Sequence, residues 1–193
     1  MENIHVIIAH YNENLSWTNN LTYPFSIISR KNIPRETPPN KGHEASSYLE
    51  YIIYNYANLP DVCIFVHGHR NDWHHKQNMD DKIYKLQFNH SYYNINDLNV
   101  DSLKNQENAL NMLQKYIHVF NEILNQNIVT EKIKYKPCAQ FYVKKQNILR
   151  NSKDKYIKLY DFLMKTNVQS YWSGRFFEYL WHFIFTGNYE DIN

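Results

Sequence analysis

Two short runs rich in β-branched and other apolar residues constrain the fold of this chain more than any other feature. They cover residues 3–9 and 61–66, and neither alternates strictly between apolar and polar side chains. A strand that is apolar at nearly every position is buried on both faces, which is typical of a sheet covered by helices on both sides. The two runs therefore predict central strands of an α/β domain.

The remaining sequence alternates strands with amphipathic segments of helical period. We expect two more strands, at residues 25–29 and 139–143, and helices at residues 15–19, 44–58, 105–125, 152–165 and 173–185. The polar, aromatic stretch 67–101 has no clear period and is interpreted as an elaborated loop with room for one short strand or helix. No repeat or linker interrupts the chain. The pattern predicts a single three-layer α/β domain over residues 1–193, with a mostly parallel sheet flanked by helices.

Charge and hydropathy narrow the class of partner. Lys and Arg number 21 against 19 acidic residues, and this net charge of +2 gives no general electrostatic reason to bind nucleic acid. The longest apolar stretch, residues 176–185, falls short of the ~20 residues that span a bilayer, and the first residues lack the basic region of a secretory signal. Both cysteines lie in apolar runs, as structural thiols of a reducing compartment do. We therefore expect a cytoplasmic protein without a membrane span.

Polar residues follow three of the predicted strands at the point where each ends. In open α/β sheets, ligands bind in the crevice beyond the carboxyl ends of the strands. If these three strands are neighbours, their polar residues converge on one site. These residues are His10, Tyr11, Asn12 and Glu13 after the first strand, Arg30 and Lys31 after the second, and His67, His69 and Arg70 after the third.

The densest chemical signal is the histidine-rich segment 67–75, which holds four of the ten histidines. An imidazole can ligate a metal, relay a proton or donate to a phosphate. His67 and His69 would point the same way if the strand continued, as two ligands of one metal ion require. The alternative is a solvated loop whose histidines pack on Trp73.

Two helix segments add further candidates. Residues 40–44 precede the second helix, where free backbone N–H groups, Lys41 and His43 would suit a phosphate; the alternative is ordinary capping. In the last helix, Arg175, Glu178 and His182 recur at i, i+3 and i+7, forming a polar stripe on an otherwise apolar helix. A buried carboxylate in such a stripe can act as a general base. The alternative is an intrahelical salt bridge that only holds the helix together.

The order of these blocks resembles the uncharacterised family known as domain of unknown function 3431. The resemblance covers nearly the whole chain. It is carried by residues 6–13 with 15–17; by residues 40–45, 48–53, 55–56, 59–61, 65–69 and 73–74; and by residues 139–141, 143, 156, 173–175 and 178–182.

The layout of this family is similar to that of nucleotide-sugar glycosyltransferases of the GT-A type, which implies a GT-A or Rossmann-like fold. By that analogy, the chain transfers a sugar from a nucleoside-diphosphate donor to a hydroxyl acceptor such as a glycan. Glu178 would be the base, with Arg175 and His182 beside it. His67 and His69 would hold a divalent metal, Mn or Mg, in the place of the usual Asp-x-Asp motif. The donor would contact His10, Tyr11, Asn12, Glu13, Arg30, Lys41, His43 and Arg70.

The chain departs from that layout because no Asp-x-Asp follows the third strand, so metal-dependent and metal-independent transfer both stay open. Two other functions fit the same residues. The first is a metal-dependent hydrolase, of phosphoesters for example, in which the histidine-rich segment binds Zn or Fe. The second is a non-catalytic carbohydrate-binding module that uses the abundant tyrosines and tryptophans as stacking platforms.

Overall fold

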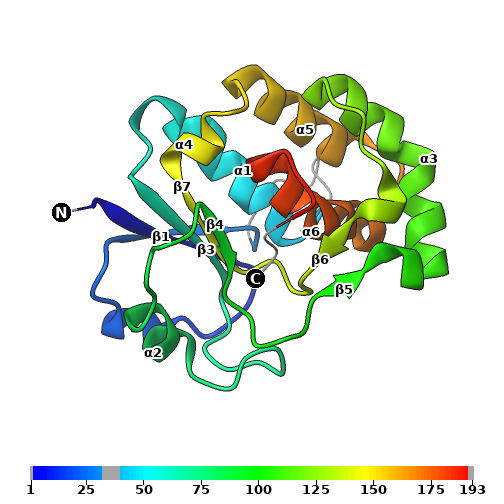
Figure 1. The fold of residues 1–193 in the computed structure, drawn as a ribbon. Helices are drawn as coiled ribbons and strands as arrows, with labels where there is room; N and C mark the ends of the chain where they lie inside the picture. The colour runs from blue at the N-terminus through cyan, green and yellow to red at the C-terminus, as the bar shows by residue number, and fades with distance from the viewer. Residues whose placement is uncertain (1, 32–39, 191–193) are drawn as a thin grey trace.

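A computed structural model describes residues 2–31 and 40–190 of the chain. A five-stranded sheet with the order β2-β1-β3-β7-β4 forms its centre (Figure 1). A separate two-stranded antiparallel ribbon pairs β5 with β6. The strands are β1 (Ile4–His10), β2 (Phe25–Ser29), β3 (Val62–His67), β4 (Tyr92–Asn94), β5 (Asp101–Ser102), β6 (Lys134–Tyr135) and β7 (Phe141–Lys144).

The sheet is mixed, whereas the sequence predicted a mostly parallel one. Strand β1 lies between β2 and β3 and is parallel to both. Strand β7 runs antiparallel to both β3 and β4. The apolar run in β7 could not reveal this direction, because a strand buried on both faces has the same composition whichever way it runs. Three parallel strands nevertheless end at one edge of the sheet, as the convergence of their polar residues requires.

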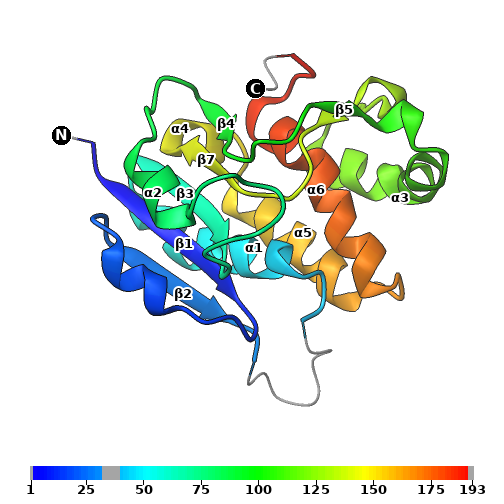
Figure 2. The same cartoon turned by 90° about the horizontal axis from the view of Figure 1, so that it is seen from below.

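Helices cover both faces of the sheet, more heavily on one than on the other (Figure 2). One face packs against α1, α3, α5 and α6, and the other against η1 and the short helix α2. Alternate residues of β3 supply the two cores, with Phe65 on the first face and Ile64 on the second. The helices are η1 (Ser16–Asn20), α1 (Glu44–Asn55), η2 (Tyr56–Asn58), α2 (Met79–Tyr84), η3 (Leu103–Asn105), α3 (Glu107–Leu124), η4 (Thr130–Lys132), α4 (Lys145–Ile148), α5 (Lys153–Lys165) and α6 (Ser170–Thr186).

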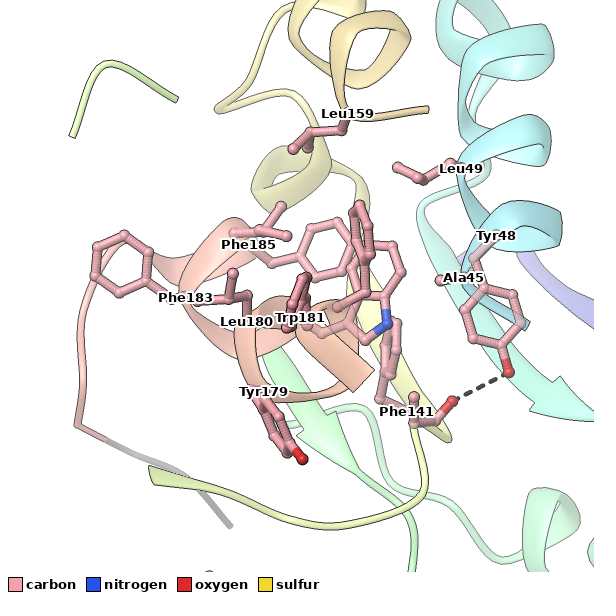
Figure 3. Packing of buried hydrophobic residues seen from close by; sticks show 14 of the residues in the cluster. Ala45, Tyr48, Leu49, Phe141, Leu159, Tyr179, Leu180, Trp181, Phe183 and Phe185 are labelled. Atoms are coloured by element: carbon pink, nitrogen blue, oxygen red, sulfur yellow. Dashed lines mark hydrogen bonds between the residues drawn. The ribbon is translucent and has the colours of Figure 1, made fainter. Parts of the chain in front are cut away.

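Aromatic rings form the centre of the larger core (Figure 3). Trp181 and Phe185, one turn apart on α6, stack with ring centroids 5.4 Å apart, and both contact Phe141 of β7. Tyr48 of α1 packs against Phe141 and Trp181 and donates its hydroxyl to the carbonyl oxygen of Ala139, at 3.1 Å. Burial of each such side chain contributes about 1.5–3 kcal/mol. This packing fixes α6 across the sheet and therefore fixes the polar residues that α6 carries.

Candidate functional site

A polar pocket of about 160 Å³ lies at the carboxyl ends of β1, β2 and β3. The strands are neighbours, so the convergence predicted from the sequence is confirmed for most of the residues that follow them. Its predicted lining residues are His10, Tyr11, Glu13, Arg30, His43, His67 and His69. Ala9, Asn40, Glu44 and Ser47 also line it.

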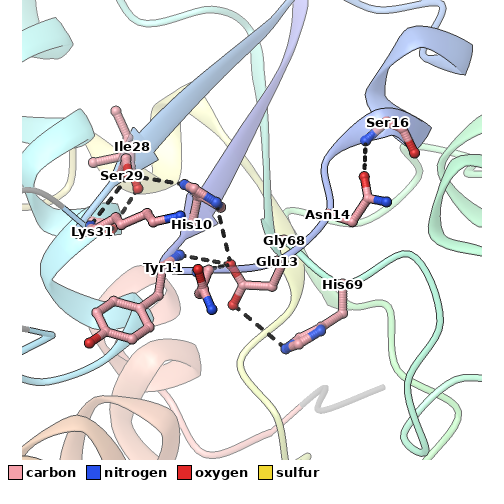
Figure 4. A network of polar contacts seen from close by, with 12 residues as sticks. His10, Tyr11, Glu13, Asn14, Ser16, Ile28, Ser29, Lys31, Gly68 and His69 are labelled. Carbon is pink, nitrogen blue, oxygen red and sulfur yellow. Dashed lines mark hydrogen bonds and ion pairs between the residues drawn. The ribbon is translucent and has the colours of Figure 1, made fainter.

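The carboxylate of Glu13 is the centre of a polar network in this pocket (Figure 4). It accepts hydrogen bonds from the backbone N–H groups of Tyr11 at 2.7 Å and Asn12 at 3.0 Å. The imidazoles of His69 and His10 lie 3.6 and 4.0 Å from its oxygens. Burial alone would raise the pKa of Glu13, but the backbone N–H donors outweigh burial and lower it. Glu13 is therefore a fixed anion and hydrogen-bond acceptor.

Gly68 allows the loop after β1 to lie directly on the end of β3. A Cβ atom at this position would lie 2.9 Å from Oε2 of Glu13 and 3.1 Å from its Cβ. The indole N–H of Trp17 donates to the Gly68 carbonyl oxygen at 2.8 Å and fastens the other end of the loop. The glycine between the two predicted metal ligands thus makes room for a carboxylate.

Lys41 does not supply a cation to the pocket, which corrects the role expected from the sequence. Its ammonium donates to the carbonyl oxygens of Thr166, at 3.1 Å, and Val168, and the side chain is buried. These carbonyls follow the C-terminal end of α5, where backbone acceptors lack helical partners. The lysine therefore joins the entry of α1 to the connection between α5 and α6.

Two glycines bring the entry of α1 into contact with α6. Gly42 has a positive φ of 70°, and its N–H donates to Oγ of Ser170 at 2.8 Å. A Cβ atom on Gly174 would lie only 2.9 Å from the carbonyl oxygen of Gly42. The backbones therefore approach more closely than any side chain would permit. This contact places Glu44 of α1 near Glu178 of α6.

Glu44 and Glu178 form a pair of interacting carboxyl groups at the pocket wall. Burial and, next, the neighbouring Glu178 raise the pKa of Glu44 to about 8. Burial likewise raises the pKa of Glu178, opposed by Arg175 and by the backbone N–H of Cys138. Two carboxyls in such a pair resist ionising together. Glu44 lines the pocket and Glu178 does not, so Glu44 is the member of the pair exposed to a ligand.

The histidine-rich segment divides between the pocket and the interior. His67 lines the pocket, and burial, followed by the charges of neighbouring histidines, lowers its pKa to about 3. Its ring packs against that of buried His74, with centroids 5.6 Å apart. Half of the His69 side chain is exposed. Within residues 2–31 and 40–190, no group of three or more His, Cys, Asp or Glu side chains is arranged to hold a metal ion. Ligation of a metal ion by His67 and His69 therefore stays a prediction.

The two guanidinium groups that were predicted to contact the donor are both engaged in ion pairs. Arg30 lines the pocket and lies 2.5 Å from the carboxylate of Glu50. Arg70 donates from Nε and one terminal nitrogen to Asp80, at 3.0 and 2.9 Å. It lines a second hollow, of about 240 Å³, next to the first. Glu13 and His69 line both hollows and so stand between them.

Three other predicted residues lie outside the pocket. The side chain of Asn12 is exposed and does not line it, so only its backbone takes part. Arg175 lines a different hollow, and its guanidinium lies 4.8 Å from the ring centroid of Tyr171. His182 lies one turn beyond Glu178, packs against Tyr92 and lines a separate hollow of about 350 Å³. His182 therefore lies at a different site from Glu178, which corrects their grouping, whereas Arg175 still acts on the charge of Glu178.

Sequence reasoning missed Glu44, Asn40 and Ser47 as pocket residues. Glu44 and Asn40 lie in the block at residues 40–44 that was singled out for its free backbone N–H groups, Lys41 and His43. No local sequence pattern marks Glu44 as a site residue, because its partner Glu178 lies 134 positions later and only the fold brings the two together.

Comparison with known proteins places the chain without assigning an activity. No curated protein and no solved structure matches it. None of the helices in the described part of the chain is long and apolar enough to cross a membrane. A family profile described as "Protein of unknown function (DUF3431)" matches residues 6–192. Because this match covers almost the whole sequence, the chain belongs to the DUF3431 family.

Proposed function

We propose that this protein is a glycosyltransferase-like enzyme that transfers a sugar from a nucleoside-diphosphate donor to a hydroxyl acceptor. The observation that carries the proposal is the half-buried Glu44 carboxyl, paired with Glu178, in a polar pocket at the carboxyl ends of three parallel strands. Perturbed carboxyls in a cleft are typical of acid–base catalysis. The pocket is smaller than the roughly 300–1,000 Å³ of sites for drug-sized ligands, so it suits one part of a substrate, such as a sugar ring.

Glu44 rather than Glu178 is the base in this proposal, because Glu44 lines the pocket. Its ionised form accepts the proton of the acceptor hydroxyl as the new glycosidic bond forms and the bond to the diphosphate breaks. A positioned base of this kind contributes typically 10²–10⁴-fold to the rate. Glu178 tunes Glu44, since its negative charge favours the protonated form of its neighbour.

In this proposal, the nucleotide part of the donor binds in the second hollow. Glu13 is an ionised acceptor, which suits the hydroxyl groups of a ribose, as carboxylates after Rossmann-type strands do. Arg70 uses only Nε and one terminal nitrogen on Asp80, and a guanidinium has five N–H donors. Its remaining N–H groups, together with His69, would stabilise the departing diphosphate. No step is assigned to a metal ion.

Calorimetry with UDP-, GDP- and dTDP-sugars tests the proposal. One of these donors should bind the wild-type protein, and Glu44→Gln should keep most of that affinity while losing transfer to an acceptor. Glu122→Gln, an exposed carboxyl on α3, is the matched control and should keep both. If no donor binds, with or without Mn²⁺, the proposal is wrong. If Glu44→Gln transfers sugar normally, the assignment of the base is wrong.

A further inference from the structure

A groove with aromatic walls lies on the outer side of α6, between its N-terminal half and the start of α3. Its volume is about 460 Å³. We call it the aromatic groove, and its lining residues are Gln106, Glu107, Asn108, Ala109, Tyr171, Trp172, Arg175 and Tyr179. The mechanism proposed above uses none of these residues.

The aromatic rings of the groove are held in place before any ligand arrives. The guanidinium of Arg175 lies 4.8 Å from the ring centroid of Tyr171, and it donates to the hydroxyl of Tyr179 at 3.3 Å. Tyr171 and Trp172 meet edge to face, with centroids 5.1 Å apart. Tyr171 is nevertheless 52% exposed. An exposed aromatic side chain in a fixed orientation can bind a ligand with little loss of conformational entropy.

The charges of the groove favour a neutral ligand. Glu107 and Arg175 are its only two charged side chains among the lining residues, and Glu178 acts on Arg175 from one turn away. A polyanion therefore meets no excess of positive charge here. A sugar ring has an apolar C–H face that stacks on an aromatic ring, and hydroxyl groups that bond to amides and carboxylates such as those of Gln106, Asn108 and Glu107.

We infer that the aromatic groove binds a neutral oligosaccharide and is the acceptor subsite of this enzyme. That the bound oligosaccharide is the acceptor rests on the proposed function. That a carbohydrate binds here rests on the groove itself. The groove adjoins the pocket across α6, because a Cβ atom on Gly174, next to Arg175 of the groove, would lie 3.2 Å from Cδ2 of His43, which lines the pocket. A chain held in the groove thus lies next to the carboxyl that would take its proton.

Binding of oligosaccharides to two tyrosine variants tests this inference. A panel of neutral oligosaccharides of glucose, mannose, galactose and N-acetylglucosamine is titrated into the full chain by calorimetry. Tyr171→Ala should weaken binding of the preferred oligosaccharide by roughly two- to tenfold, the usual contribution of one aromatic contact. Tyr54→Ala removes a ring that is 79% exposed on α1, outside the groove, and should leave the affinity unchanged. Binding of nucleotide-sugars should be the same in both variants.

The outcomes separate this inference from the proposed function. If nucleotide-sugars bind and no oligosaccharide does, the acceptor subsite is refuted while the donor pocket stands. If oligosaccharides bind through Tyr171 and no donor binds, the groove is a carbohydrate site and transfer is refuted. If Tyr171→Ala leaves the affinity unchanged, or if anionic oligosaccharides bind more tightly than neutral ones, the inference is wrong.

Discussion

Gly174→Ala sets two opposing effects against each other at the contact between α6 and the entry of α1. An alanine in a helix interior is about 1 kcal/mol more favourable than a glycine. Its Cβ atom, however, would lie 2.9 Å from the carbonyl oxygen of Gly42 and 3.2 Å from Cδ2 of His43. The Gly42 backbone cannot move away easily, because its N–H is bound to Ser170, whose hydroxyl is bound to Asn40.

Overpacking of this kind costs about 1–3 kcal/mol, so steric cost should exceed the gain in helix propensity. We expect Gly174→Ala to lower the free energy of unfolding by up to about 2 kcal/mol in urea denaturation. The variant Asn111→Ala, at an exposed position of α3, measures the propensity effect alone and should be neutral or slightly stabilising. A Gly174→Ala protein that is about 1 kcal/mol more stable than the wild type would refute the close contact.

The remaining predictions concern charge and loop geometry in the pocket. Glu178→Gln removes a negative charge that raises the pKa of Glu44, so the pH at which transfer reaches half its maximum should fall below about 8; an unchanged pH profile would contradict the pairing. The pKa of His67 is lowered from 6.5 to about 3, so below pH 6.5 the unfolded state binds the proton more readily. The neutral His67 imidazole therefore carries no penalty above pH 6.5. Between pH 6.5 and pH 3 it lowers the free energy of unfolding by at most about 1.4 kcal/mol per pH unit. In urea denaturation between pH 7 and pH 5, His67→Asn should show a weaker loss of stability than the wild type. Gly68→Ala places a Cβ atom 2.9 Å from Glu13 and should weaken nucleotide-sugar binding, with a smaller effect on stability measured as the urea midpoint. An affinity equal to that of the wild type would show that binding does not need Glu13 in its observed position.

Much of the fold could be predicted from the period of the apolar residues. Strand β2 has the expected bounds, and α5 and α6 lie within three residues of the segments predicted for them. The region 67–101 was expected to hold one short element, and it contains helix α2, strand β4 and the first residue of β5. These elements are too short for the repeat of apolar residues along a helix or a strand to be visible in the sequence.

The candidate site was predictable where it depends on strand ends and not where it depends on long-range partners. The parallel arrangement of β1, β2 and β3 brings His10, Arg30 and His67 together, as expected from their positions after apolar runs. Lys41 binds carbonyl oxygens that follow α5, and the pKa of Glu44 is raised by Glu178 of α6, so both depend on residues distant in the sequence. Local sequence carries no record of such neighbours, so a cation beside a helix start was interpreted as a phosphate ligand when it binds carbonyl oxygens.

The bonds from residues 40–42 to residues 166–170 also have a consequence for the order of folding. They join positions separated by 125 to 130 residues, and they hold the wall of the pocket that carries Glu44. Contacts of such long sequence separation form slowly, because the intervening loop must close first. During synthesis on the ribosome, strands β1 to β3 can pair long before α6 has emerged, so the nascent protein should form the parallel part of its sheet early and complete the pocket only at the end.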